Sequence, residues 1–154
     1  MKLKGTISVK HVRDGKIIAE ETVQNTITNV GLGKVAGLIN GQVTNTYKYL
    51  AVGDSSTAAA AGDTTLASEI TAPTSIDRVI ANTVTQITTA QTDDTAQLVV
   101  TFTNNSSTTV SVQEAGMFDT STENGGNMLG RQSFTAKSME ENDTLQIQYN
   151  IQVQ

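Results

Sequence analysis

The sequence predicts an all-β protein whose antiparallel strands form a two-sheet sandwich of jelly-roll type. The clearest sign is the segment 144–154, where apolar and polar residues alternate without a slip, as in a strand with one buried face and one exposed face. Threonine, a β-branched residue that favours strands, occurs 25 times, and turn-forming residues recur along the chain. A chain of 154 residues is long enough for one domain with a buried core, so we expect a single β-sandwich domain over residues 1–154.

The first predicted element is a β-hairpin within residues 1–28. Asp14–Gly15 separates two strand-like runs, and this dipeptide favours the positive φ angles of a two-residue hairpin turn. Ile17–Ile18 interrupts the alternation of the return strand and indicates a β-bulge. The hairpin either belongs to the sandwich or extends from it as an arm.

The second predicted element is one short helix near residues 29–40. Thr28 or Asn29 is a suitable N-cap, and Gly41 can end the helix in the left-handed conformation. Because the helix is glycine-rich, we expect it to lie on a sheet with a broad apolar face. That face consists of Val30, Leu32, Val35, Ala36, Leu38 and Ile39.

The remainder of the chain predicts strands separated by short turns. A loop of small residues interrupts this pattern at 53–65, and we expect it to lie on the surface. The predicted strands cover residues 47–52, 77–89, 95–103, 109–115, 128–136 and 144–154.

Charge is distributed unevenly along the chain. Residues 1–48 contain seven Lys or Arg and three Asp or Glu, whereas residues 49–154 contain three and twelve, for a net charge of -5. The acidic total argues against nucleic-acid binding, and no apolar run has the length of a membrane helix. The basic N-terminal segment is a candidate docking surface, through charge or through pairing of an edge strand. Its residues are Lys2, Lys4, Lys10, Arg13 and Lys16.

The polar side of the last strand is a second candidate interface, because it carries amides instead of charges. Amides are cheaper to desolvate against a partner than ions, whereas exposed strands are commonly defended by charge. A simply uncharged, exposed face remains the alternative. The amide side chains are Gln146, Gln148, Asn150 and Gln152.

Residues suited to catalysis or to metal binding are sparse. The chain has no Cys and a single His, His11, which we expect on the surface. Glu114 and Asp119 form a conceivable carboxylate pair for glycoside hydrolysis, but the chain has no Trp to stack on a sugar. Asp54 and Asp63 are either Ca²⁺ ligands or, as we favour, loop-capping carboxylates. We therefore predict no enzyme activity, no cofactor and no metal.

Several segments, read in order, resemble small structural proteins of tailed-phage virions, of the capsid decoration, head-fibre and tail-fibre types. The resemblance covers most of the chain from about residue 28 onward. The segments are Thr28–Leu32, Tyr49–Thr57, Gly62–Ile70 with Arg78, Glu114–Asp119, Gly125–Arg131 and the closing strand from Asp143.

This resemblance implies scaffold roles for the motif residues. Gly53 and Gly116 would lie where the backbone needs room, Leu66 and Ile70 would plug the sandwich end, and two ion pairs would hold the loops. These pairs are Glu69 with Arg78 and Glu114 with Arg131.

The resemblance also implies a function without an active site. We expect a capsid decoration protein, made in the host cytoplasm and assembled into the virion as a homotrimer, with the phage major capsid protein as its partner. A tail-fibre or baseplate component that contacts tail proteins, or a receptor-binding module, is the alternative. A glycan hydrolase comes third.

Overall fold

The computed structural model describes residues 1–154 and contains nine strands and one helix. The elements in chain order are β1 (Leu3–Arg13), β2 (Lys16–Ile27), α1 (Asn29–Ile39), β3 (Tyr49–Gly53), β4 (Val79–Ile80), β5 (Thr83–Ile87), β6 (Thr95–Thr103), β7 (Val110–Phe118), β8 (Met128–Met139) and β9 (Thr144–Val153).

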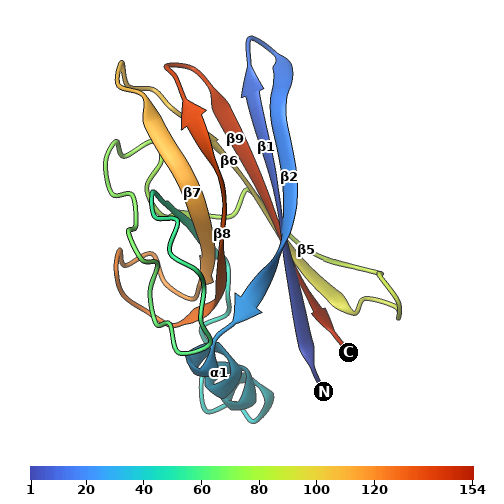
Figure 1. Ribbon diagram of the computed structural model, residues 1–154. Helices are drawn as coiled ribbons and strands as arrows, with labels where there is room; N and C mark the ends of the chain where they lie inside the picture. The colour runs from blue at the N-terminus through green and yellow to red at the C-terminus, as the bar shows by residue number, and fades with distance from the viewer.

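The strands form one antiparallel sheet that curls on itself. Their order is β4-β3-β7-β8-β2-β1-β9-β6-β5, and the half with β7 and β8 faces the half with β1, β9 and β6 (Figure 1). The all-β prediction is confirmed, but a division into two separate sheets is not. The long strand β2 runs beside β1 and pairs at Thr26 and Ile27 with β8, so it joins the two halves.

The hydrophobic core lies between the two halves of the curled sheet. From β9 it receives Leu145, Ile147, Tyr149 and Ile151, all buried, while the amides between them point outward. The alternation predicted for the last strand is therefore confirmed. β9 lies between β1 and β6, so both of its edges are paired and its inner face is covered.

The N-terminal hairpin has the predicted turn and bulge. Asp14 and Gly15 have φ angles of 49° and 72°, and the pairing slips where His11 opposes Ala19 and Val12 opposes Ile17. The hairpin is not an arm, however. β1 is hydrogen-bonded to β2 on one side and to β9 on the other, so it has no free edge for a neighbouring subunit, and removing residues 1–12 would delete a central strand.

The helix has the predicted ends but not the predicted face. Thr28 caps it by accepting a hydrogen bond from the Gly31 N–H, and Gly41 has a φ of 73°. The buried positions are Gly31 and Lys34, while Leu32 and Ile39 are 46% and 71% exposed. Only a narrow strip of the helix packs, because Gly31 lies so close to the Leu129 backbone that a Cβ would collide with it.

The segment predicted as one strand over 77–89 forms two, β4 and β5, at opposite edges of the sheet. The change occurs at Ala81 and Asn82. Ala81 donates its N–H to the Lys48 carbonyl, and the Asn82 side chain accepts the N–H of Thr101, which lies on β6. The chain therefore passes from one edge of the curled sheet to the other.

No helix is long and apolar enough to span a membrane.

Candidate functional site

Arg131 on β8 fixes the long loop between β3 and β4. Its guanidinium contacts Glu114 at 2.9 Å and Asp63 at 2.5 Å, and it donates to the Thr57 carbonyl at 2.8 Å. Glu114 in turn accepts the N–H groups of two loop residues, Ala67 and Ser68. The predicted Glu114–Arg131 pair therefore forms, and it holds loop backbone as well as charge.

Arg78 forms a second buried centre at the end of the same loop. It donates to both carboxylate oxygens of Glu69 at 2.7 and 2.8 Å, and both side chains are fully buried. Its guanidinium stacks 3.6 Å from the ring centroid of Phe118 and also donates to the Gly125 carbonyl. The predicted Glu69–Arg78 pair therefore forms and ties the loop to the β7–β8 connection.

The motif glycines lie where the backbone has no room for a side chain. A Cβ on Gly53 would collide with Glu114 and with the Ser68 carbonyl, and one on Gly116 would press on Leu66. Leu66 and Ile70 are both buried. The glycine expectation is therefore confirmed, and Leu66 packs in a small cluster with Ala51, Phe118 and Met128.

Three of the four acidic side chains proposed above as catalytic or metal-binding candidates, Glu114, Asp119 and Asp63, have structural contacts. Asp119 is buried, pairs with Lys34 and accepts two hydrogen bonds from Asn127. Burial by itself would raise the pKa of Asp119, but the hydrogen bonds from Asn127 and Lys34 outweigh it and lower the pKa. Asp63 caps the loop by accepting the Ala60 N–H at 2.9 Å, whereas Asp54 is exposed.

His11 is buried, which corrects the expectation of a surface position. It follows Ile7 and Val9 on the inward side of β1, and its Nε2 lies 2.8 Å from the Asp143 carboxylate. Arg13 also donates to Asp143, at 2.7 Å. The hydrogen bond from Arg13 is the main reason that the pKa of Asp143 is lowered. The period-two pattern from Ile7 to His11 was the signal that could have placed this side chain inside.

Three of the four predicted amides gather on one outward surface, here called the amide face. The fourth, Gln152, is instead buried and donates to the Asp94 carboxylate at 2.8 Å. The strand register brings residues from five strands together on the amide face: Ser8 lies opposite Thr22 and Gln148, and Gln148 lies opposite Val99. The Gln97 side chain donates to Asn150 at 3.1 Å. The amide face comprises Thr6, Ser8, Thr22, Gln24, Thr83, Thr85, Gln97, Val99, Thr101, Gln146, Gln148 and Asn150.

The basic residues of the N-terminal segment separate in space. Lys4 and Lys10 border the amide face, opposite Gln152 and Gln146, and Lys10 lies 3.9 Å from Glu20. Arg13 is instead engaged with Asp143 and with Glu140. Lys2 and Lys16 are exposed, Lys16 at the hairpin turn. The structure therefore brings only two of the five predicted cations to the amides.

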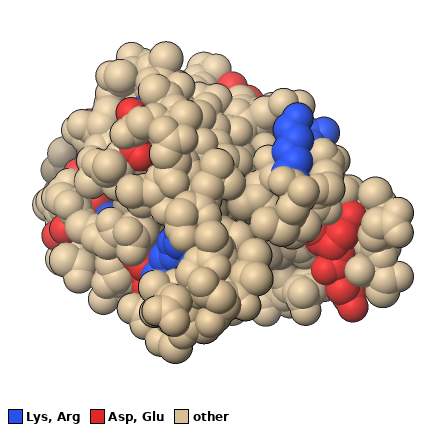
Figure 2. Space-filling view, turned by 90° about the horizontal axis from the view of Figure 1, so that it is seen from below, with Lys and Arg blue, Asp and Glu red and all other residues tan.

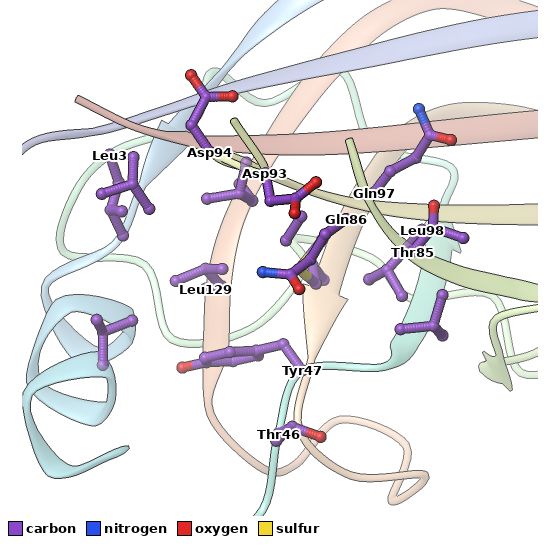
Figure 3. A pocket seen from close by; sticks show the side chains of 16 residues that line it. Leu3, Thr46, Tyr47, Thr85, Gln86, Asp93, Asp94, Gln97, Leu98 and Leu129 are labelled. Atoms are coloured by element: carbon purple, nitrogen blue, oxygen red, sulfur yellow. The ribbon is translucent and has the colours of Figure 1, made fainter. Parts of the chain in front are cut away.

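A pocket that the sequence analysis did not foresee opens on the inner side of β5. It is called the slot here, has a volume of about 300 Å³ and is lined mainly by apolar side chains, with no Lys or Arg. Figure 3 shows Thr46 and Tyr47 along one side of it and Thr85, Gln86 and Asp93 along the other. Its apolar lining is Leu3, Val35, Tyr47, Val84, Ala96, Leu98, Met117, Leu129, Ile151 and Val153.

Both sides of the slot carry backbone without a partner. β5 pairs only with β6 and is the last strand of the sheet, and residues 44–47 make no backbone–backbone hydrogen bond. The Tyr47 hydroxyl is also buried without a partner, and burial is the main reason that the pKa of Tyr47 is raised. No sequence pattern indicated the slot. One of its sides comes from the start of the predicted strand 47–52 and the residue before it, and the other comes from the segment 77–89 that was predicted as a single strand.

The end of the molecule that carries α1 and both chain termini is mostly uncharged, and its acidic and basic side chains stand in separate small groups (Figure 2). No group of three or more His, Asp or Glu side chains is positioned to hold a metal ion.

Neither a family model nor a curated protein matches the chain.

Proposed function

We propose that this chain is a capsid decoration protein, which binds an assembled phage shell through the amide face and has no catalytic activity. In this role the two facing halves of the curled sheet would act as a two-layer, jelly-roll-like scaffold. The observation that carries it is the amide face itself, where five strands present amides, hydroxyls and Val99 with few charges at the border. Desolvating such a surface against a protein partner costs less free energy than desolvating a charged surface.

The rest of the molecule supports this role by keeping that surface rigid. β9 and β1 lie in the middle of the sheet, paired on both sides, and the core packs directly under them. A rigid surface loses little conformational entropy when it binds. A protein that binds the assembled shell and not its free subunits stabilises the shell by mass action.

The proposed partner is the phage major capsid protein, and the proposed form is a homotrimer in the virion after synthesis in the host cytoplasm. Lys4 and Lys10 border the amide face and would meet acidic groups on the shell. Their contribution is screened over about 8 Å at physiological ionic strength, so binding should weaken with added salt.

Copy number in purified virions tests the proposal most directly. Quantitative mass spectrometry should find hundreds of copies per particle for a decoration protein. A handful of copies would instead indicate a tail-fibre or baseplate component or a receptor-binding module, and absence from virions would contradict both. Light scattering on the purified and on the particle-bound protein should give the mass of a trimer, and a monomer in both states would rule the trimer out.

A point variant tests the surface. Gln148→Arg places a charge at the centre of the amide face, where it would have to be desolvated on binding. Cosedimentation with particles that lack the protein should show at least a tenfold loss of occupancy, with an unchanged melting temperature. The control, Thr108→Arg, changes an exposed loop residue and should bind normally. Equal binding by both variants would show that another surface contacts the particle.

A further inference from the structure

The slot lies where the curled sheet fails to close. β4 and β5 are its two edge strands, and only Ala81 and Asn82 separate them along the chain. Thr46 and Tyr47 on one side face β5 on the other across the apolar pocket (Figure 3). The opening is therefore a gap in the sheet as well as a pocket.

The free edge of β5 is not protected in the usual ways. Exposed edge strands commonly carry Lys, Pro or inward-pointing charges that discourage pairing. β5 reads Thr-Val-Thr-Gln-Ile, without a charge or a proline, and four of its five residues are exposed. Val84 is 59% exposed although it lines an apolar pocket. A strand of this kind is a template for another extended segment.

The slot also has a charge preference. Asp93 and Asp94 line it and no cation does. The Asp94 carboxylate accepts hydrogen bonds from Gln152 and from backbone N–H groups of the preceding turn, but the carboxylate of Asp93 has no hydrogen bond or ion pair. It remains available to a positive group at one end of the slot.

We propose that the slot binds an extended segment of a partner protein, which adds as a strand along β5, places alternate apolar side chains on the slot floor and sets a Lys or Arg beside Asp93. Strand addition of this kind takes affinity from main-chain hydrogen bonds and specificity from pockets for alternate side chains. Here Thr46 and Tyr47 offer unpaired backbone on the second side, and the Tyr47 hydroxyl is a further unpaired group.

Two other occupants fit these features less well. A small apolar molecule would fill the pocket but leave both backbone edges unpaired. A second copy of this chain offers β5 as its longer free edge, since β4 has only two residues, and β5 carries no cation to meet Asp93. The inference does not depend on the proposed particle binding. Val84 and Leu98 line the slot but do not belong to the amide face, and the two surfaces share only Thr85 and Gln97.

The test begins with a displayed library of random nine-residue peptides, selected on the folded protein and counter-selected on the Val84→Arg variant. Enriched peptides should show apolar residues at alternate positions and a Lys or Arg near one end. Failure to enrich any peptide, or enrichment of peptides without this alternation, would overturn the proposal.

Synthetic versions of the enriched peptides then give affinities by fluorescence anisotropy. Val84→Arg should weaken binding at least tenfold, whereas Thr83→Arg, on the outward face of the same strand, should stay within twofold. Asp93→Asn should weaken binding severalfold and remove most of its salt dependence, while Asp54→Asn, at an exposed aspartate elsewhere, should not. Equal effects of the slot variants and their controls would contradict the proposal.

Hydrogen exchange tests the main-chain pairing itself. Bound peptide should slow the exchange of the unpaired β5 amides at least tenfold, which filling of the pocket alone would not do. A wild-type dimer that Val84→Arg dissociates would show that a second copy occupies the slot and would overturn the proposal. Particle binding by Val84→Arg should remain normal, so this test and that of the amide face can fail separately.

Discussion

Two irregular segments flank β3, and they differ in the hydrogen bonds and ion pairs that hold them. The loop 54–78 after β3 is held by two buried arginines. Arg78, at its end, binds the Glu69 carboxylate, and Arg131 binds the Asp63 carboxylate and the Thr57 carbonyl. Residues 44–47 before β3 make no backbone–backbone hydrogen bond, and Thr46 and Tyr47 among them line the slot. Buried charge fixes one segment, while the other leaves the Tyr47 hydroxyl and backbone groups without hydrogen-bond partners. The difference separates a structural loop from a candidate binding site.

The largest effect should come from breaking the fixed loop. Glu114→Gln removes the fully buried carboxylate that faces Arg131 and leaves only the partly exposed Asp63 to compensate that charge. Removing one partner of a buried ion pair typically costs about 3–5 kcal/mol of unfolding free energy. Thermal or urea unfolding would measure the loss. The exposed Glu123 supplies the control, since Glu123→Gln should change stability by at most about 0.5 kcal/mol. An unchanged Glu114→Gln protein would mean that this carboxylate does not stabilise the fold.

A second buried charge should make stability depend on pH. Asp143 accepts hydrogen bonds from His11 and Arg13, and hydrogen bonds to charged groups contribute about 1.5–3 kcal/mol, which Asp143→Asn should largely remove. The Arg13 hydrogen bond, above all, lowers the pKa of Asp143 in the folded protein. Its contribution is therefore present above the unfolded-state pKa of about 4 and is lost as the pH falls toward the folded-state pKa.

Chemical unfolding between pH 7 and pH 2 would measure this dependence. The free energy of unfolding of the wild type should fall more steeply below about pH 4 than that of Asp143→Asn. Other carboxylates with lowered pKa values, such as Asp63 and Asp119, are common to both proteins and cancel in the difference. Parallel curves would show that Asp143 has an ordinary pKa.

Substitutions at the rim of the slot should destabilise the protein less than substitutions at its floor. Val84 is largely exposed, so Val84→Arg should change the unfolding free energy by about 0.5 kcal/mol or less. Leu98 is buried on the adjacent strand and shared by the slot and the core, so Leu98→Ala should cost about 2–5 kcal/mol. A strongly destabilised Val84→Arg protein would place Val84 in the core and would remove the basis for a free edge.

The smallest effect concerns two tyrosine hydroxyls. The hydroxyl of Tyr47 is buried without a partner, so Tyr47→Phe should leave stability unchanged or raise it by about 1 kcal/mol or less, because an unpaired buried polar group is destabilising. The hydroxyl of Tyr149 is 2.5 Å from the Asn25 side-chain nitrogen, so Tyr149→Phe should lower stability by about 1 kcal/mol. A marked loss in Tyr47→Phe would reveal a partner for that hydroxyl.

Elements with local signals were predictable from the amino-acid sequence. Alternation in 144–154, the Asp14–Gly15 turn, the bulge at Ile17–Ile18 and the helix ends at Thr28 and Gly41 all appear as predicted. Each of these elements depends on the period of the side chains or on a residue that permits a particular φ angle. Both properties are set by residues close together in the sequence. The ion pairs of Arg78 and Arg131 were also predictable, although from the resemblance and not from spacing.

Which surfaces are buried depends on contacts between residues that are far apart in the sequence. The sequence did not show that β1 is central, that His11 faces Asp143, that α1 buries Lys34, or that 77–89 divides between two edges. These outcomes depend on contacts between residues far apart in the chain, and a periodic pattern says that a face is apolar without saying what packs on it. The slot has the same origin, because the residues that line it come from segments far apart in the chain, from Leu3 to Val153.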